Sequence, residues 1–300
     1  MPITAKRMIG AHRIDWQHRR PAATGGGAKW RSLSDRLRKD ARAFVRSIRE
    51  RGLLSSLHIG LSTLWCAFLD QLDERIYRTN TSGGVPIASL EIPSENKTHS
   101  GPYSTPSQFR IMKKAFKAVM ELRGPGSSTS TLIDFGCGKG RVLMVGSEFG
   151  FQRLIGVEFS PELCREAEAA ICAYVQRTRK PFRFQVVNAD ATRFAIPPEA
   201  DVFYFFAFDG YVLDQVAQNI LQSTRESPRP VWAIYVKAIH DEVFTARGFR
   251  VVRELRWSGW PTRIFALDSG PRPGAEVDRV GPLPSEGYRA RHPTITSPVR

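Results

Sequence analysis

Three glycines separated by single residues follow an apolar stretch that ends in an acid. The stretch is TLIDFGCGKGRVL, with Asp134 ahead of Gly136, Gly138 and Gly140. Glycine permits positive φ and lets a ligand approach the backbone closely, and a helix that starts after such a loop offers free N–H groups. The pattern therefore predicts a loop that binds a nucleotide-like ligand.

The spacing of the glycines separates the candidate ligands. A dinucleotide fingerprint is GxGxxG, whereas here the order is GxGxG and Arg141 stands where the third glycine should be. A phosphate-binding P-loop has no fitting frame around Lys139. Asp134 at the mouth of the loop would repel a pyrophosphate and attract a sulfonium with an α-amino group. An NAD enzyme is therefore disfavoured.

The segment DFGCGKG resembles the first motif of the class I S-adenosylmethionine (SAM) dependent methyltransferases, an acid followed by xGxGxG. The resemblance covers about residues 100–268 and implies a SAM-dependent methyltransferase, hence an enzyme. The cofactor-binding residues that it implies are Tyr103, Thr105, Asp134, Gly136, Cys137, Gly138, Gly140, Glu158, Phe159, Asp190 and Ala191.

Two of these residues are acids at the ends of predicted strands. The resemblance implies that Glu158, in GVEFSPEL, takes both ribose hydroxyls, which suits the two acceptor oxygens of a carboxylate. It implies that Asp190, in VVNADATRF, binds the adenine amino group while the N–H of Ala191 contacts a ring nitrogen. The alternatives are that Glu158 is a surface acid at a strand end and that Asp190 is a turn-forming residue.

A tyrosine and a Thr-Pro lie upstream, in GPYSTPSQFRIM. This segment looks like the YxPT segment of a bacterial methyltransferase group that is distantly similar to protein-lysine methyltransferases. By that resemblance Tyr103 and Thr105 sit over the methionine end of SAM. The alternative is a capping turn ahead of an ordinary helix.

The methyl acceptor is expected near the loop after the fourth strand. The resembling group often has Asn-Pro-Phe there, but this chain has Ala207, Phe208 and Asp209, so an amine clamp cannot be carried over. Phe206 and Phe208 either stack on adenine or substrate or belong to the core. His240 either takes a proton or forms a helix-capping pair with Asp241.

No catalytic residue follows from these patterns. Protein lysine is the best interpretation of the acceptor. An RNA or small-molecule methyltransferase is one alternative, although no RNA-binding signature is visible. A non-catalytic protein that binds SAM or nucleic acid is the other alternative.

The elements that must position these residues alternate along the chain. Expected strands are TLIDF, RLIGVEF, FRFQVVNA, DVFYFFAF, PVWAIYV, FRVVRELRW and RIFALD, and expected helices are Gly140–Phe149, Pro161–Arg177 and Tyr211–Glu226. Near-continuous apolar strands between helices predict a parallel sheet covered on both faces. The fold class is therefore α/β, a doubly wound, mostly parallel, seven-stranded Rossmann-like sheet with an antiparallel last strand and an N-terminal helical extension.

Basic residues gather at the beginning of the 300-residue chain, whose formal net charge is +15. Residues 1–50 contain thirteen Lys and Arg against four Asp and Glu, a balance of +9. We predict a disordered basic arm over 1–50 that contacts an acidic partner or nucleic acid, with a transit peptide as the alternative. Residues 51–100 form the helical extension, 101–269 the methyltransferase domain and 270–300 a disordered tail.

Within the extension, GLLSSLHIGLSTLWCAFL has apolar residues at helical spacing. They are Leu53, Leu57, Leu61, Leu64, Trp65, Phe68 and Leu72. The pattern predicts an amphipathic helix whose apolar face docks on the body, with peripheral membrane contact as the alternative and no transmembrane span. The four cysteines form no CxxC pair and no zinc spacing, so no metal is expected, and a reducing, cytoplasmic location fits.

Overall fold

The computed structural model describes residues 52–92, 95–101, 103–124, 130–257 and 260–268. The chain divides into two compact units, one up to Gly60 and one from Leu61 onward. The described part of the first unit is the beginning of helix α2 (Leu53–Tyr77), and the packing reported below belongs to the second unit. The predicted basic arm and C-terminal tail lie outside the described residues.

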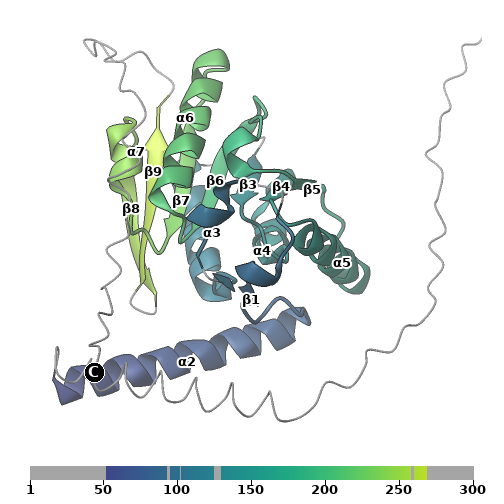
Figure 1. The fold of residues 1–300 in the computed structure, drawn as a ribbon, viewed down its shortest axis with the longest axis vertical. Helices are drawn as coiled ribbons and strands as arrows, with labels where there is room; N and C mark the ends of the chain where they lie inside the picture. Colours follow the sequence, from purple (N-terminus) through teal and green to yellow (C-terminus); the bar gives the residue numbers. More distant parts are fainter. Residues whose placement is uncertain (1–51, 93–94, 102, 125–129, 258–259, 269–300) are drawn as a thin grey trace, which may run out of the picture. The chain divides into compact units, whose positions relative to one another are not determined.

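Seven strands form one sheet in the order β5-β4-β3-β6-β7-β9-β8 (Figure 1). Neighbours from β5 to β7 are parallel, whereas β9 is antiparallel to both β7 and β8. The strands are β3 (Thr131–Phe135), β4 (Arg153–Glu158), β5 (Phe184–Asn188), β6 (Ala200–Phe206), β7 (Val231–Val236), β8 (Arg250–Trp257) and β9 (Trp260–Leu267). This confirms the predicted α/β class and the antiparallel last strand.

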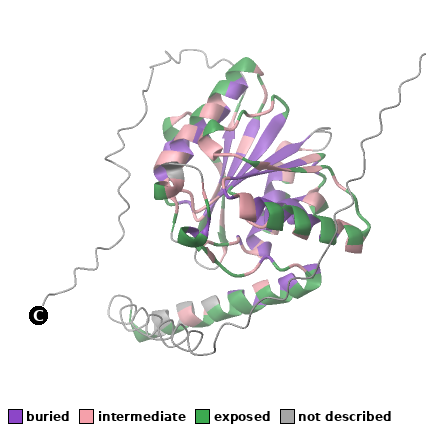
Figure 2. Ribbon diagram, turned by 45° about the vertical axis from the view of Figure 1, so that its right-hand side comes forward, coloured by how far each residue is buried: buried purple, intermediate pink, exposed green. Residues whose placement is uncertain are grey.

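Helices cover both faces of the sheet, so the strands are buried throughout much of their length (Figure 2). One core cluster joins the sheet to α3 (Phe109–Arg123), α4 (Arg141–Gly146) and α5 (Pro161–Thr178). The other joins it to α6 (Gly210–Glu226) and α7 (Glu242–Ala246). Successive strand residues point to opposite faces, which is why the central strands β3, β4, β6 and β7 are buried at nearly every position.

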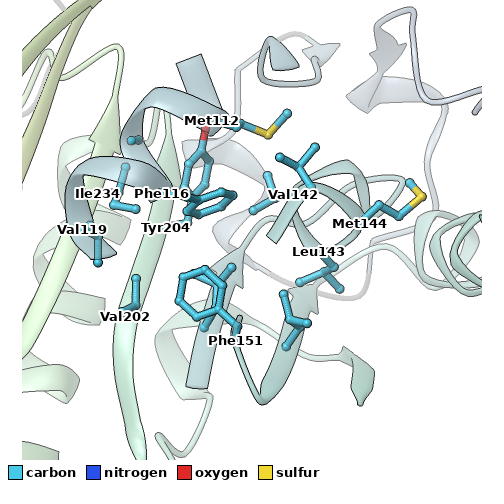
Figure 3. Packing of buried hydrophobic residues seen from close by; sticks show 14 of the residues in the cluster. Met112, Phe116, Val119, Val142, Leu143, Met144, Phe151, Val202, Tyr204 and Ile234 are labelled. Carbon is cyan, nitrogen blue, oxygen red and sulfur yellow. The ribbon is translucent and has the colours of Figure 1, made fainter. Parts of the chain in front are cut away.

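Aromatic packing fixes α3 on the sheet. The ring of Phe116 lies 5.5 Å from that of Phe151 and 5.8 Å from that of Tyr204, between centroids (Figure 3). The hydroxyl of Tyr204 is fully buried, and it shares a 2.6 Å hydrogen bond with the hydroxyl of Ser107. A buried hydroxyl requires such a partner, so this bond also holds the segment before α3 against the core.

Short elements complete the second unit. β1 (Val85–Pro86) pairs antiparallel with β2 (Tyr103–Ser104). The predicted helix 140–149 is α4 followed by the single 3-10 turn η3 (Ser147–Phe149). The other 3-10 turns are η1 (Ile87–Ser89), η2 (Glu95–His99) and η4 (Ala191–Arg193).

The prediction for the docked face of α2 was wrong. The apolar stripe from Leu61 to Leu72 is exposed, and the face that packs on the body carries Cys66, Leu69, Asp73 and Tyr77, all buried. Helical periodicity shows that residues share a face but not which face meets the body. Here the docked face also carries acids that pair with arginines of the body, namely Asp70 and Glu74 with Arg141 and Asp73 with Arg110.

The carboxyl ends of the parallel strands lie along one edge of the sheet. The segments that leave this edge are the glycine loop after β3 and the residues after β4, β5, β6 and β7. In open α/β sheets, ligands bind outside these carboxyl ends, at the point where the strand order reverses. That point lies here between β3 and β6, because β4 and β5 follow on one side of β3 and β6 and β7 on the other.

Candidate active site

The glycine loop adopts a backbone that only glycine takes without strain. Gly136, Gly138 and Gly140 have φ of 71°, 51° and 76°. A Cβ on Gly140 would stand 3.0 Å from Cδ1 of Ile171, so α5 packs directly against the loop. The N–H of Gly136 donates to the carbonyl of Val157 at 2.8 Å, which ties the loop to the end of β4.

Glu158 joins the end of β4 to the glycine loop. Its carboxylate is 3% exposed and accepts from the N–H of Gly138 at 2.9 Å and from the N–H of Ser160 at 3.0 Å. Burial raises the pKa of Glu158, and these N–H groups oppose that rise. Each carboxylate oxygen still has a second acceptor position. The arrangement therefore fits the expected ribose contact, which stays a prediction.

Asp134 is buried at the end of β3, and its position is electrostatically unfavourable. Among the described residues its Oδ2 atom has no hydrogen-bond partner. Burial, with the nearby charge of Glu158, raises the pKa of Asp134 well above its ordinary value. A buried carboxylate without partners is costly unless a cation or donor reaches it. This group therefore fits a positively charged ligand such as SAM.

Asp190 caps a turn. Its Oδ1 accepts from the N–H of Thr192 at 2.9 Å and from the hydroxyl of Thr192 at 2.7 Å, which starts η4. The turn-forming interpretation of Asp190 is therefore confirmed. The adenine contacts proposed for Asp190 and Ala191 stay predictions, as do the roles of Cys137 and Phe159.

The segment around Tyr103 and Thr105 reaches the glycine loop through the residue between them. Oγ of Ser104 lies 3.5 Å from where a Cβ of Gly138 would stand, whereas Tyr103 is 53% exposed. The expected contact of Tyr103 and Thr105 with the methionine end of SAM remains untested. Sequence reasoning did not select Ser104, because a single serine in a short strand carries no distinctive pattern.

The start of α3 is not capped by its own turn. Gln108 precedes the helix and makes no side-chain cap. Instead, the N–H of Phe109 donates to Oδ1 of Asp70 in α2 at 3.1 Å. The capping-turn interpretation was therefore wrong, because the side chain that caps α3 is Asp70 of α2 and not a residue of the turn before α3.

The loop after β6 has an unusual backbone at Ala207. Its φ is 51°, in the left-handed region that glycine and asparagine adopt readily and in which alanine is strained. The backbone here would suit asparagine, but the side chain at this position has no amide. Phe206 and Phe208 both pack on core clusters, and the ring of Phe208 also lies 3.3 Å from where a Cβ of Gly136 would stand.

His99 approaches this loop from η2. Its Nδ1 lies 3.4 Å from Oδ1 of Asp209, and its ring stacks on Tyr211 with centroids 4.5 Å apart. Asp209 caps α6 by accepting from the N–H of Tyr211 at 3.0 Å. Residues 99 and 209 are far apart in sequence, so no local signal pointed to the pair.

The side chain of His240 does not form the expected helix-capping pair with Asp241. Its Nδ1 lies 3.5 Å from Oε1 of Glu242, and Asp241 makes no side-chain cap on α7. Asp241 forms an ion pair with Arg263 of β9 instead. The capping interpretation was therefore wrong. Within the described ranges, no group of three His, Cys, Asp or Glu side chains is placed to hold a metal ion.

Arg141, where a dinucleotide fingerprint would have glycine, follows the loop directly and is 3% exposed. All five of its N–H donors are used. It donates to Asp70 (3.0 Å), Glu74, Thr81 (2.8 Å), Ser82 (3.0 Å) and the carbonyl of Ser107 (3.0 Å). The guanidinium also lies 4.3 Å from the centroid of the Phe109 ring. Arg141 therefore fastens α2 and the segment after it to the start of α4.

Comparisons with known proteins add the following. No protein-family model matches the chain, and no curated protein matches it. Among solved structures, the chain is similar to the O-MT segment of StiE, at 19% identity and a TM-score of 0.38 over 49% of this chain and 53% of that one. The chain thus spans about half the length of that relative.

Two further solved structures are similar to the chain over more than half of its length. A SAM-dependent methyltransferase from Aquifex aeolicus is 13% identical, with a TM-score of 0.38 over 54% of this chain and 98% of that one. A candidate RNA methyltransferase from Pyrococcus horikoshii is 15% identical, with a TM-score of 0.41 over 61% of this chain and 95% of that one. These are proteins that the chain resembles, and its own site residues carry the functional proposal.

Proposed function

We propose that the chain is a SAM-dependent methyltransferase. The observation that carries this proposal is the buried carboxylate of Asp134, which lacks a partner on Oδ2 beside a glycine loop with three left-handed glycines. A dinucleotide would bring a pyrophosphate to this loop, next to the buried acids Asp134 and Glu158, and it would supply no positive charge to Oδ2 of Asp134. A ligand with a sulfonium and an ammonium group would be attracted.

Each part of the site has its own task in this proposal. Asp134 attracts the positive end of the cofactor, Glu158 binds the ribose, and the glycine loop lets the cofactor approach the backbone. When bound, SAM supplies an electrophilic methyl group whose transfer leaves a neutral thioether. The protein aligns the acceptor with that methyl group, which is the main contribution expected for an in-line displacement.

The cofactor assignment is tested by calorimetric titration of the purified protein with SAM and, separately, with NADH. Micromolar binding of SAM without a response to NADH supports the proposal. Folded protein that does not bind SAM would overturn it. A screen with radiolabelled methyl groups on protein, RNA and small-molecule fractions then identifies the acceptor.

Replacing Asp134 by asparagine should stabilise the ligand-free protein at neutral pH and weaken SAM binding. Because folding raises the pKa of Asp134, the folded chain holds a proton that the unfolded chain releases, so the wild type loses stability as pH rises above about 3.8. The Asp134→Asn variant should not lose stability in this way as pH rises. We expect a melting temperature higher by ~5 °C at pH 7, and SAM affinity lower by at least about tenfold.

The comparison is made by thermal unfolding and SAM titration between pH 5 and pH 8. SAM affinity of the wild type should rise with pH, because binding favours the ionised carboxylate, and the Asp134→Asn variant should lose most of this dependence. Asp268→Asn changes an exposed acid and serves as the control. Equal SAM affinity in Asp134→Asn and wild type would remove Asp134 from the site.

For the acceptor, we propose that His99 takes the proton that the nucleophile loses. Asp209 faces Nδ1 of His99, which leaves Nε2 as the nitrogen that can accept a proton. The pair adjoins Phe208, whose ring covers Gly136 of the glycine loop. A base suits an acceptor with a proton to lose, either a lysine amine, which we favour, or a hydroxyl of RNA or of a small molecule.

Substituting His99 by asparagine should lower kcat by about a hundredfold with little change in SAM affinity. The measurement uses the acceptor found in the labelling screen, and it follows kcat/KM across pH. The part of the pH profile in which kcat/KM depends on the protonation of the base should disappear. Asp209→Asn retains an N-cap for α6 and removes only the charge beside His99, so a smaller loss of kcat is expected. An unchanged profile in His99→Asn would reduce the pair to a structural contact.

A further inference from the structure

The outer side of α2 carries an unusual row of exposed apolar side chains. We call this row the outer stripe; its members are Leu61, Leu64, Trp65, Phe68, Leu72 and Ile76, exposed between 39% and 69%. Their spacing of three and four residues places them on one face of the helix. The rings of Trp65 and Phe68 stack with centroids 5.7 Å apart.

The outer stripe is distinct from the face that docks on the body. The docked face is held by buried Leu69 and Tyr77 and by the acids Asp70, Asp73 and Glu74, which bond arginines of α3 and α4. α2 therefore has two apolar faces, of which the fold uses one. Among the described residues, the large apolar side chains that are exposed outside α2 number only three, Tyr103, Ile239 and Val251.

Charge indicates what the outer stripe meets. The acids of the helix from Leu61 onward point to the docked face, whereas Arg75 is exposed. Immediately before the helix, residues 1–50 carry the balance of +9 described above. A fitting partner must therefore bury apolar side chains and also present negative charge.

We propose that α2 lies in the surface of an anionic lipid membrane, with the outer stripe buried in the lipid. Leucine, tryptophan and phenylalanine on one face, next to a basic segment, are the composition of an interfacial helix. No described helix is long and apolar enough to cross the bilayer. The proposal is independent of the methyltransferase assignment.

Other occupants fit the same surface less well. Nucleic acid would satisfy the basic segment but would leave the outer stripe in water. A second copy of the chain would cover the outer stripe but would supply no negative charge for the basic residues 1–50, because its own balance there is also +9. A lipid surface satisfies both the charge and the apolar face.

The test is co-sedimentation of the full chain with vesicles of phosphatidylcholine, with and without phosphatidylglycerol. The variant Leu64→Ser, Trp65→Ser, Phe68→Ser changes three exposed residues of the outer stripe, and Val251→Ser on β8 is the matched control. We expect binding to the anionic vesicles that weakens with salt, and at least a tenfold loss in the triple variant alone. The melting temperature should be the same in all three proteins, which would show that the triple variant is folded.

Several outcomes would overturn the proposal. Vesicle binding by the triple variant equal to that of wild type would assign binding to the basic segment alone. Absence of wild-type binding to either vesicle would exclude a membrane role. A dimer in light scattering that the triple variant converts to a monomer would assign the outer stripe to a second copy.

Discussion

Replacing Glu158 by alanine is expected to weaken SAM binding by at least about a hundredfold. In the proposed site its carboxylate accepts both ribose hydroxyls, and each hydrogen bond to a charged group contributes about 1.5–3 kcal/mol, where 1.4 kcal/mol is tenfold in affinity. Glu158 is buried at the end of β4, so water does not easily replace the lost acceptor. Calorimetric titration measures the effect.

The hydrogen bonds within the protein complicate this substitution. Glu158 also accepts from the N–H groups of Gly138 and Ser160, one on each oxygen. Alanine leaves both donors without an acceptor, and the glycine loop can then relax. Glutamine is no milder, because its NH₂ group would face one of the two N–H donors. Lost affinity alone therefore does not establish a contact with ribose.

A change in the ligand separates the two effects. S-adenosylhomocysteine and its 2′-deoxy analogue differ by one ribose hydroxyl. Wild type should bind the ligand with the complete ribose about tenfold or more tightly than the 2′-deoxy analogue. Glu158→Ala should bind both ligands with the same affinity. The four affinities form a double-mutant cycle, in which one change is in the protein and the other is in the ligand. Glu168→Ala, an exposed acid on α5, is the control and should behave as wild type. A Glu158→Ala variant that still prefers the ribose would assign the diol to another group.

Local patterns predicted the sheet and the loop because their causes are local. The central strands, such as TLIDF and DVFYFFAF, are mostly apolar since both faces of the sheet are covered there, and the structure confirms this. The glycines of the loop have positive φ, as their residue type indicated. Such features follow from backbone sterics and side-chain period, which a single sequence displays.

Features that depend on distant contacts were not predictable in the same way. The approach of His99 to Asp209 and the outward direction of the outer stripe depend on how α2 and η2 meet the body. Arg141 is the clearest case. Its position after the glycines argued against a dinucleotide, but its five donors are used by residues that lie 34 to 71 positions away.

Substituting Arg141 by methionine is therefore expected to cost about 3–5 kcal/mol of unfolding free energy. The guanidinium is buried, and its removal leaves the carboxylates of Asp70 and Glu74 without their counter-charge. For a domain of this size we expect a fall in melting temperature of ~10 °C. Lysine should not restore stability, because a single ammonium cannot replace five donors in a fixed plane.

The loss of unfolding free energy in Arg141→Met should become smaller at acidic pH. Burial tends to raise the pKa of Glu74, but the hydrogen bond from Ser82, the charge of Arg141 and the N–H of Thr81 together bring it below the ordinary value. A lowered pKa in the folded state gives stability that is present above the ordinary value and is lost as pH falls through the folded one. The gap between wild type and Arg141→Met should therefore narrow below about pH 4.5.

Arg110→Met provides the matched control. Arg110 is also an arginine paired with an acid of α2, at 3.1 Å, but its side chain is 39% exposed, so a loss under about 1 kcal/mol is expected. Thermal and urea unfolding of both variants measure the difference. Similar small losses in the two variants would mean that Arg141 is not the residue that fastens α2 to the glycine loop. A large loss in Arg141→Met alone, with weaker SAM binding, would show that the N-terminal helix supports the cofactor loop through this side chain.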